Sequence, residues 1–226
     1  MKHENLDRLS ILVAVAAVAA AIGVMSLTGR LETHEIYPQP DPGVFTHQED
    51  SCIVVSDSVM RVLSVNIPQD SISLRRSSSF LNAEELSSDT FRTFASKMLS
   101  TVKAPEYDGV GIAAPQVGIL RRVIAVCRVD KDGAPFEVYP NVQIDSLFGE
   151  IRSGMEGCLS IPGIRGRVPR YSSVIVSYDN PETLSRERDT VSGFASVIFQ
   201  HECDHLDGIL YTDKADSLFS DGPVSR

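Results

Sequence analysis

Apolar side chains recur every three or four positions between residues 88 and 102, in the stretch SDTFRTFASKMLSTV. This spacing places them on one face of a helix. Ser88 or Asp89 can cap the start of that helix, because both are good acceptors for the first free backbone N–H groups. The pattern therefore predicts a helix packed by one face against a core.

A second helix is predicted from about Gly193 to Asp207, with Thr190 or Ser192 as its cap. Gly208 follows at the position where a glycine in the left-handed conformation commonly ends a helix. The polar residues of this helix share a face with apolar ones, so that face is expected to be buried.

Alternation in steps of two predicts strands at residues 121–129 (RRVIAVCRV) and 172–179 (SSVIVSYD). Residues 135–144 and 150–154 are weaker strand candidates. One early helix, several short strands and one late helix indicate an α+β fold. We expect short, mostly antiparallel strands packed around the C-terminal helix, with the N-terminal helix before the sheet.

The N-terminal part of the chain differs in composition from the rest. Residues 9–27 (LSILVAVAAVAAAIGVMSL) carry no charge and are long enough to cross a bilayer as a helix. A signal anchor is the interpretation that we favour. A cleaved signal peptide fits the same residues, as does a soluble Ala-rich helix or an extension from a mis-assigned start codon.

Changes in composition along the chain suggest four regions. An acidic stretch contains alternating prolines, which stiffen a linker and block helix formation, and it ends in the apolar patch CIVV, interpreted as an edge strand. The predicted regions are a hydrophobic anchor or signal peptide (1–30), this linker (31–60), a globular domain (61–215) and a tail (216–226).

Composition narrows the class of protein. The 226 residues suffice for one sizeable core, and the net charge of −9 argues against binding to nucleic acid through the overall field. Four cysteines without a C-x-x-C pair exclude a disulfide framework and a zinc ribbon.

The stretch FQHECDHLDG carries the candidate chemistry. His201 and His205 stand four apart, so on a helix both imidazoles can reach one divalent ion. Glu202 lies beside that ion, as a base for water would. The alternative is a chance coincidence of polar residues, because H-E-x-x-H alone is a weak signal.

Two further stretches favour the metal site. Cys158, in GMEGCLSIPG, is the best candidate for the third ligand that a catalytic metal needs, although a cysteine is more often a small buried apolar residue. The stretch GVGIAAPQVG (109–118) lets another backbone approach closely, and Gln116 offers an amide donor. It lacks the lysine and the third glycine of a phosphate-binding loop.

Together GVGIAAPQ, EGCLS and HECDHLDG resemble the peptide deformylase family, over roughly residues 72–214. The resemblance implies metal ligands at Cys158, His201 and His205, a general base at Glu202, and oxyanion donors at Gln116 and the Leu159 N–H. It implies that the substrate lies along Val110 and Gly111. It also implies a pocket for methionine, flanked by Glu156 and formed by Val110, Phe194, Val197 and Ile198.

The function implied by this resemblance is removal of the formyl group from the N-terminal formyl-methionine of new peptides, with release of formate. The expected cofactor is one divalent ion, ferrous iron (Fe2+) first, with zinc (Zn2+) or nickel (Ni2+) as substitutes. The expected partners are an N-formyl-methionyl peptide and, through residues 9–27, a membrane. Such a substrate places the catalytic domain in the cytoplasm, whereas the front segment leaves anchoring or export open.

Two other functions fit the same motifs. One is a related metalloamidase or peptidase that acts on another acyl group. The other is a protein without catalytic activity that keeps the fold and holds a metal. The presence of ligands, base and donors together argues for the enzyme.

Overall fold

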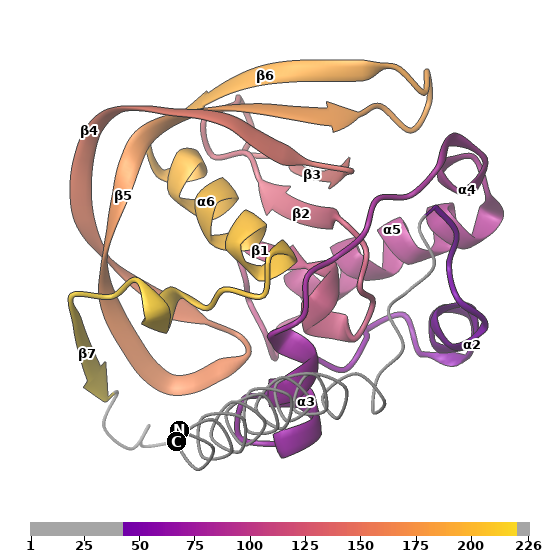
Figure 1. Ribbon diagram of the computed structural model, residues 1–226, viewed down its shortest axis with the longest axis horizontal. Coiled ribbons are helices and arrows are strands. Elements are labelled where there is room, and N and C mark those ends of the chain that lie inside the picture. The colour runs from indigo at the N-terminus through magenta and orange to yellow at the C-terminus, as the bar shows by residue number, and fades with distance from the viewer. Residues whose placement is uncertain (1–42, 221–226) are drawn as a thin grey trace, which may run out of the picture. The chain divides into compact units, whose positions relative to one another are not determined.

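The computed structural model describes residues 43–220 (Figure 1). Its α-helices are α2 (His47–Val55), α3 (Pro68–Leu74), α4 (Ala83–Leu86), α5 (Asp89–Lys103) and α6 (Phe194–Leu206), with short 3-10 helices η1 (Ala114–Val117) and η2 (Tyr211–Asp213). Its strands are β1 (Gly111–Ala113), β2 (Val123–Cys127), β3 (Phe136–Pro140), β4 (Gln143–Cys158), β5 (Ile161–Asp179), β6 (Arg186–Ser192) and β7 (Ser217–Ser220).

The strands form two antiparallel sheets. One has the order β1–β2–β3, and the other has the order β4–β5–β6, with β7 paired to part of β5. Helix α6 contacts strands of both sheets, and β4 and β5 curve around it (Figure 1). The predicted α+β class, with antiparallel strands around a late helix and an earlier helix before the sheet, is confirmed.

Strand β2 is the centre of the first sheet, and all five of its residues are buried. Val123 and Ala125 belong to the apolar cluster that includes residues of α5, whereas Ile124 and Val126 belong to the cluster around α6. The predicted alternation is therefore present. Both faces of β2 are buried, however, whereas a strand that alternates in this way commonly has one face exposed to solvent.

The two predicted helices are present. Ser88 caps α5 by accepting a hydrogen bond from the backbone N–H of Phe91 at 3.0 Å. The predicted side-chain cap of α6 is wrong, because Gly193 occupies the cap position and no side-chain hydrogen bond is made there. Gly208 has a φ of 71°, so the left-handed end of α6 is confirmed.

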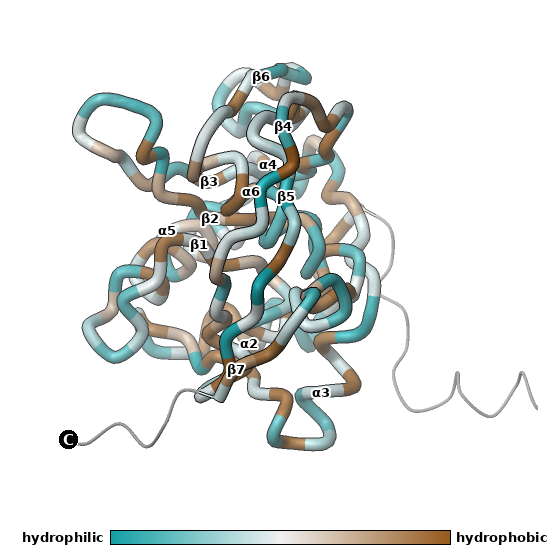
Figure 2. The backbone as a smooth tube through the Cα atoms, turned by 90° about the vertical axis from the view of Figure 1, so that its left-hand side faces the viewer, coloured by the Kyte–Doolittle hydropathy of each residue, from teal (hydrophilic) through white to brown (hydrophobic). Residues whose placement is uncertain are grey.

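Strands β4 and β5 are much longer than expected, at 16 and 19 residues. Their pairing contains register shifts, including one between Phe148 and Ile151, and such shifts interrupt the alternation of the two faces. Most of β4 is exposed on both faces. Apolar and polar segments consequently mix along this part of the chain (Figure 2), and no regular period marks the strands.

The predicted edge strand at CIVV is wrong, because these residues end helix α2. Thr46 and Glu49 form a reciprocal capping box at the start of that helix, a signal that outweighs the local run of β-branched residues. Ile53 is fully buried against the core, whereas Val54 and Val55 are exposed. The packed body therefore begins earlier than the predicted boundary at residue 61.

The predicted anchor, residues 9–27, lies outside the described residues. Within residues 43–220, no helix has the length and apolar character needed to span a membrane.

Candidate metal centre

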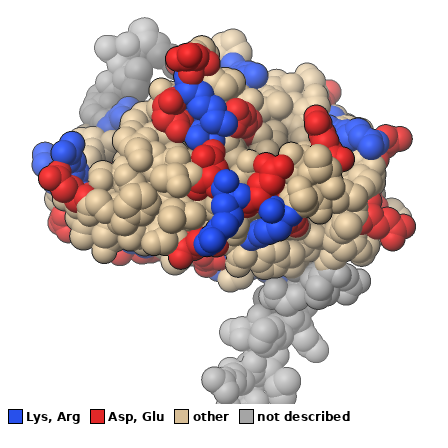
Figure 3. Space-filling model, turned by 90° about the horizontal axis from the view of Figure 1, so that it is seen from above, with Lys and Arg blue, Asp and Glu red and all other residues tan. Residues whose placement is uncertain are grey.

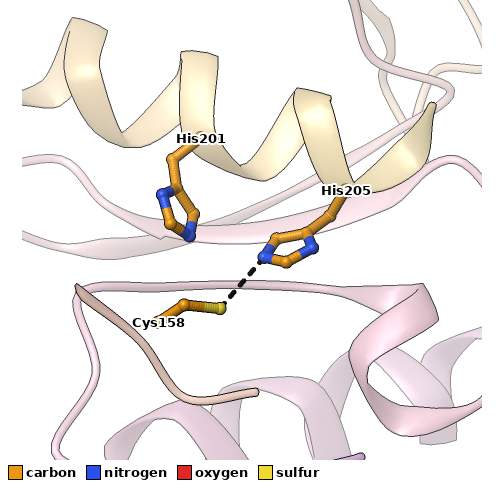
Figure 4. A group of neighbouring side chains, drawn as sticks. All are labelled: Cys158, His201 and His205. Atoms are coloured by element: carbon orange, nitrogen blue, oxygen red, sulfur yellow. Dashed lines mark hydrogen bonds between the residues drawn. The ribbon is translucent and has the colours of Figure 1, made fainter. Parts of the chain in front are cut away.

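Cys158, His201 and His205 converge at one point. Helix α6 supplies the two histidines one turn apart, and Cys158 is the last residue of β4. The ligand atoms of all three lie within 4.8 Å of one another. Both rings turn toward the sulfur in Figure 4, and His205 Nε2 is 3.2 Å from Cys158 Sγ. The structure thus brings together the three predicted ligands.

Glu156 fixes the ring of His201. Its Oε2 atom is 2.8 Å from His201 Nδ1, which leaves Nε2 of that ring to face the cluster. Arg170 donates to both oxygens of Glu156, at 2.8 and 3.0 Å. Burial opposes ionisation of Glu156, but the hydrogen bonds from His201 and Arg170 outweigh it and lower its pKa. Glu156 was predicted to flank the methionine pocket; it lines the cleft, and its carboxylate also contacts the ring of His201.

Arg170 connects Glu156 to charged side chains in the C-terminal part of the chain. Arg170 Nη1 also donates to Asp204 at 2.6 Å, and Lys214 donates to the other oxygen of Asp204 at 2.6 Å. Arg170 and Asp204 are largely buried, so each charge there faces an opposite one. This network holds the strand that carries Arg170 against the helix that carries both histidines.

Glu202 is buried beside the cluster, and within the described residues its Oε2 atom has no hydrogen-bond partner. Burial raises its pKa to about 7. A carboxyl group of this kind can take and return a proton near neutral pH. Such a proton carrier is what hydrolysis at an activated water requires.

Gln116 faces the cluster from η1, the short helix directly after β1. Its Oε1 accepts from the Ala113 N–H at 2.8 Å, and its Nε2 lies 3.4 Å from Cys158 Sγ and 3.2 Å from Ser160 Oγ. The amide donor therefore points into the site. Leu159 follows Cys158 directly and lines a cleft beside the cluster.

A cleft of about 420 Å³ opens next to His201 and Glu202. Five of the residues predicted to meet the substrate line it: Val110, Glu156, Phe194, Val197 and Ile198. Gly111 lies in β1, which among the described strands pairs only with β2 and so offers a free edge to the cleft side. The site can accept an extended chain beside an apolar pocket.

Sequence reasoning missed several residues of the site: Tyr107, Asp108, Met155 and Arg165 in the cleft wall, and Arg170 and Tyr211 behind the ligands. Met155 stands in the stretch GMEGCLSIPG, but its side chain was not singled out there. The other five residues belong to none of the three motifs, and they reach the site only through contacts between distant parts of the chain.

The donor set suits a catalytic divalent ion. Two imidazoles and one thiolate are three protein ligands, and the adjoining cleft gives access to a further position. The Nδ1 atom of His205 is buried without a hydrogen-bond partner among the described residues. Such ligands favour zinc, iron or nickel over calcium or magnesium.

Comparison with known proteins assigns the family. The family model described as "Polypeptide deformylase" matches residues 62–220. This chain is a member of the peptide deformylase family. The membership expected from the three sequence motifs is confirmed, and the chain is that of a metal-dependent deformylase.

Relatives of this deformylase span most of the described body. The peptide deformylase of Leptospira biflexa serovar Patoc is 30% identical over 167 residues, which are 71% of this chain and 89% of the relative. That of Symbiobacterium thermophilum is 47% identical over 119 residues, which are 52% of each chain.

Two solved deformylase structures carry ligands. The Acinetobacter baumannii enzyme with Met-Ala-Ser bound has a TM-score of 0.60 and 35% identity, covering 69% of this chain and 98% of its own. The Synechococcus elongatus enzyme in complex with actinonin has a TM-score of 0.62 and 30% identity, covering 72% of this chain and 84% of its own.

Proposed function

We propose that this deformylase removes the formyl group from N-terminal formyl-methionine of new peptides, with Cys158, His201 and His205 holding the divalent ion. The observation that carries the proposal is the convergence of these three side chains at the end of a cleft whose wall includes buried Glu202. Sulfur and nitrogen donors fit ferrous iron, zinc and nickel alike, and ferrous iron is the ion that we favour.

A divalent ion held there supplies Lewis-acid chemistry toward water and the formyl carbonyl. Glu202 accepts the proton of the attacking water and passes it to the departing amine. Gln116 Nε2 and the Leu159 N–H stabilise the negative charge that develops on the formyl oxygen. The C–N bond breaks, and formate and a peptide with a free methionine amine leave.

The peptide is held as an added strand along the free edge of β1, at Gly111, with Val110 directly before that strand. The methionine side chain enters the apolar pocket next to Ile198, which is buried, and Phe194, which is more than half exposed at the cleft. The Met-Ala-Ser ligand of the Acinetobacter relative has the chemistry of the expected product. Attachment to a membrane through residues 9–27 stays a prediction.

Formate release tests the proposal. The purified chain, prepared without oxygen, should release formate from formyl-Met-Ala, while acetyl-Met-Ala and unblocked Met-Ala should be left intact. Oxygen is excluded because both a thiolate and ferrous iron oxidise readily. Equal cleavage of the formyl and acetyl peptides would instead favour an amidase of broader specificity.

The variant Glu202→Gln separates the enzyme from a metal-holding protein without activity. It keeps the shape of the side chain but cannot carry the proton, so turnover should fall at least about a hundredfold. Bound metal, measured by elemental analysis, should stay at the wild-type level. Unchanged turnover would remove Glu202 from the mechanism.

A further inference from the structure

Tyr211 lies behind the metal centre, in η2, five residues after the end of α6. Only 1% of its surface is exposed. Its ring stacks on that of His201, with 5.8 Å between ring centroids and 21° between ring planes. Because Glu156 holds one edge of the imidazole, Tyr211 restricts the remaining freedom of that ring, which is rotation out of its plane.

The hydroxyl of the same side chain contacts the backbone of a residue that lines the substrate cleft. It donates a hydrogen bond of 2.8 Å to the backbone carbonyl of Ile164 in β5. Ile164 and its neighbours Gly163 and Arg165 form one wall of the cleft. One buried residue therefore touches both a metal ligand and the wall against which a peptide would lie.

The chain makes room for this contact with a glycine. A Cβ atom at Gly166 would lie 2.8 Å from Tyr211 Cε2 and 3.1 Å from Leu218 Cδ2, closer than such atoms pack. Strand β7 pairs with the same part of β5, from Ile164 to Arg167. The cleft wall is thus held in place from behind by Tyr211 and by the end of the described chain.

We propose that Tyr211 is a positioning residue that couples the orientation of His201 to the β5 wall of the substrate cleft. The proposal rests on the proposed function for its substrate, a formyl-methionyl peptide, and on the Cys158, His201 and His205 cluster for its metal. It assigns two separable tasks to one side chain: the ring orients the ligand, and the hydroxyl holds the wall.

The variant Tyr211→Phe removes the hydroxyl and keeps the ring. KM for formyl-Met-Ala-Ser and the dissociation constant of the product Met-Ala-Ser should each rise about threefold to tenfold, the usual scale of one lost hydrogen bond. The value of kcat and the rate at which zinc is lost to a chelator should not change. Tyr178→Phe is the matched control, because the Tyr178 hydroxyl also makes one hydrogen bond from β5, to Glu187 at 3.0 Å, without lining the cleft.

The variant Tyr211→Leu also removes the ring. Zinc loss to a chelator should become roughly tenfold faster or more, the range found when groups that orient metal ligands are replaced. Unfolding temperatures of all variants are measured with metal bound. A purely structural role predicts that Tyr211→Phe and Tyr178→Phe lower the unfolding temperature alike, with KM, peptide affinity and zinc retention as in the wild type, and that result would overturn the proposal.

The two proposals can fail separately. Wild-type protein that binds zinc but releases no formate would reject the deformylase function, while zinc retention by Tyr211→Leu would still decide whether Tyr211 orients His201. Wild-type formate release, together with unchanged zinc retention in Tyr211→Leu and unchanged peptide affinity in Tyr211→Phe, rejects the role of Tyr211 alone.

Discussion

Gly111 and Glu202 come from distant parts of the chain and meet at the edge of the cleft. A Cβ atom at Gly111 would lie 2.5 Å from Glu202 Oε1 and 2.7 Å from Ile198 Cγ2. Because Gly111 has no side chain, the Glu202 carboxyl group has room at this position, and the backbone of β1 is accessible to a peptide. A carboxyl group displaced by even an ångström can lose much of its effect on the reaction.

Replacing Gly111 by alanine should push the Glu202 carboxyl group away from the cluster. We expect kcat/KM for formyl-Met-Ala to fall about a hundredfold or more, the scale of a lost acid–base group. Bound metal, measured in the same samples, should not change, because no ligand is displaced. Gly154→Ala is the control, since a Cβ there meets no atom within 4 Å; equal activity of the two variants would contradict the argument.

The proposed ligands and the proposed base could be picked out from the sequence because they sit in short motifs. His201, Glu202 and His205 lie within one and a half turns of one helix, and Cys158 stands in a glycine-punctuated segment. The contact between Glu156 and His201 joins residues 45 apart in sequence. No local pattern reports such a pair, so the orienting role of Glu156 and the presence of Arg170 and Tyr211 emerged only from the structure.

The C-terminal end of helix α6 packs closely against the end of helix α3. Gly208 follows α6 in the left-handed conformation, and a Cβ there would lie 2.4 Å from the backbone carbonyl oxygen of Arg75. Arg75 is the C-cap of α3 and directly follows its last residue, Leu74. The helix that carries two proposed metal ligands thus abuts backbone that cannot easily move aside.

Gly208→Ala should destabilise the protein more than the conformation alone explains. A left-handed alanine costs roughly 1–2 kcal/mol, and the overlap with backbone adds about 1–3 kcal/mol. Gly133→Ala isolates the first part, because Gly133 has a φ of 75° and a Cβ there meets no atom within 4 Å. Urea unfolding measures both variants, and equal losses would show that the overlap relaxes without cost.

Elements whose apolar residues follow one regular spacing could be predicted from the sequence, and elements without such a spacing could not. Helix α5 and strand β2 each follow a single repeat. In β4 the register shifts break the alternation, and solvent on both faces removes the apolar constraint. The apolar run CIVV predicted a strand where helix α2 ends, because the run taken alone is typical of strands. The capping box at Thr46 and Glu49, which precedes it, is the signal that indicates the helix.

The whole molecule is acidic, yet many of its acidic groups are paired. Figure 3 shows basic and acidic side chains intermixed on one face. Among residues 43–220, four aspartates have a lowered pKa, in each case chiefly because a side chain donates a hydrogen bond to the carboxylate: Asp70, Asp130, Asp145 and Asp213. These groups link the stability of the fold to pH.

Stability should fall on acidification. The unfolded chain binds protons on these aspartates at a higher pH than the folded chain does, so their contribution is complete only above pH about 5. It is lost as the pH falls through the lowered folded pKa values. Melting curves at constant ionic strength measure the loss. Asp70→Asn should lower stability at pH 7 and reduce the loss in acid; an unaltered acid slope in that variant would contradict the assignment.

Arg121 has no exposed surface, and its guanidinium donates to the Glu49 carboxylate of α2 at 2.8 and 3.1 Å. The family match begins at residue 62, after that helix. A minimal recombinant fragment cut to the family boundaries would lose this carboxylate together with the buried side chains of Phe45 and Ile53, which belong to the apolar core. Any shortened version for crystallisation or inhibitor screening should therefore begin ahead of Gly43, with its affinity tag upstream of that point.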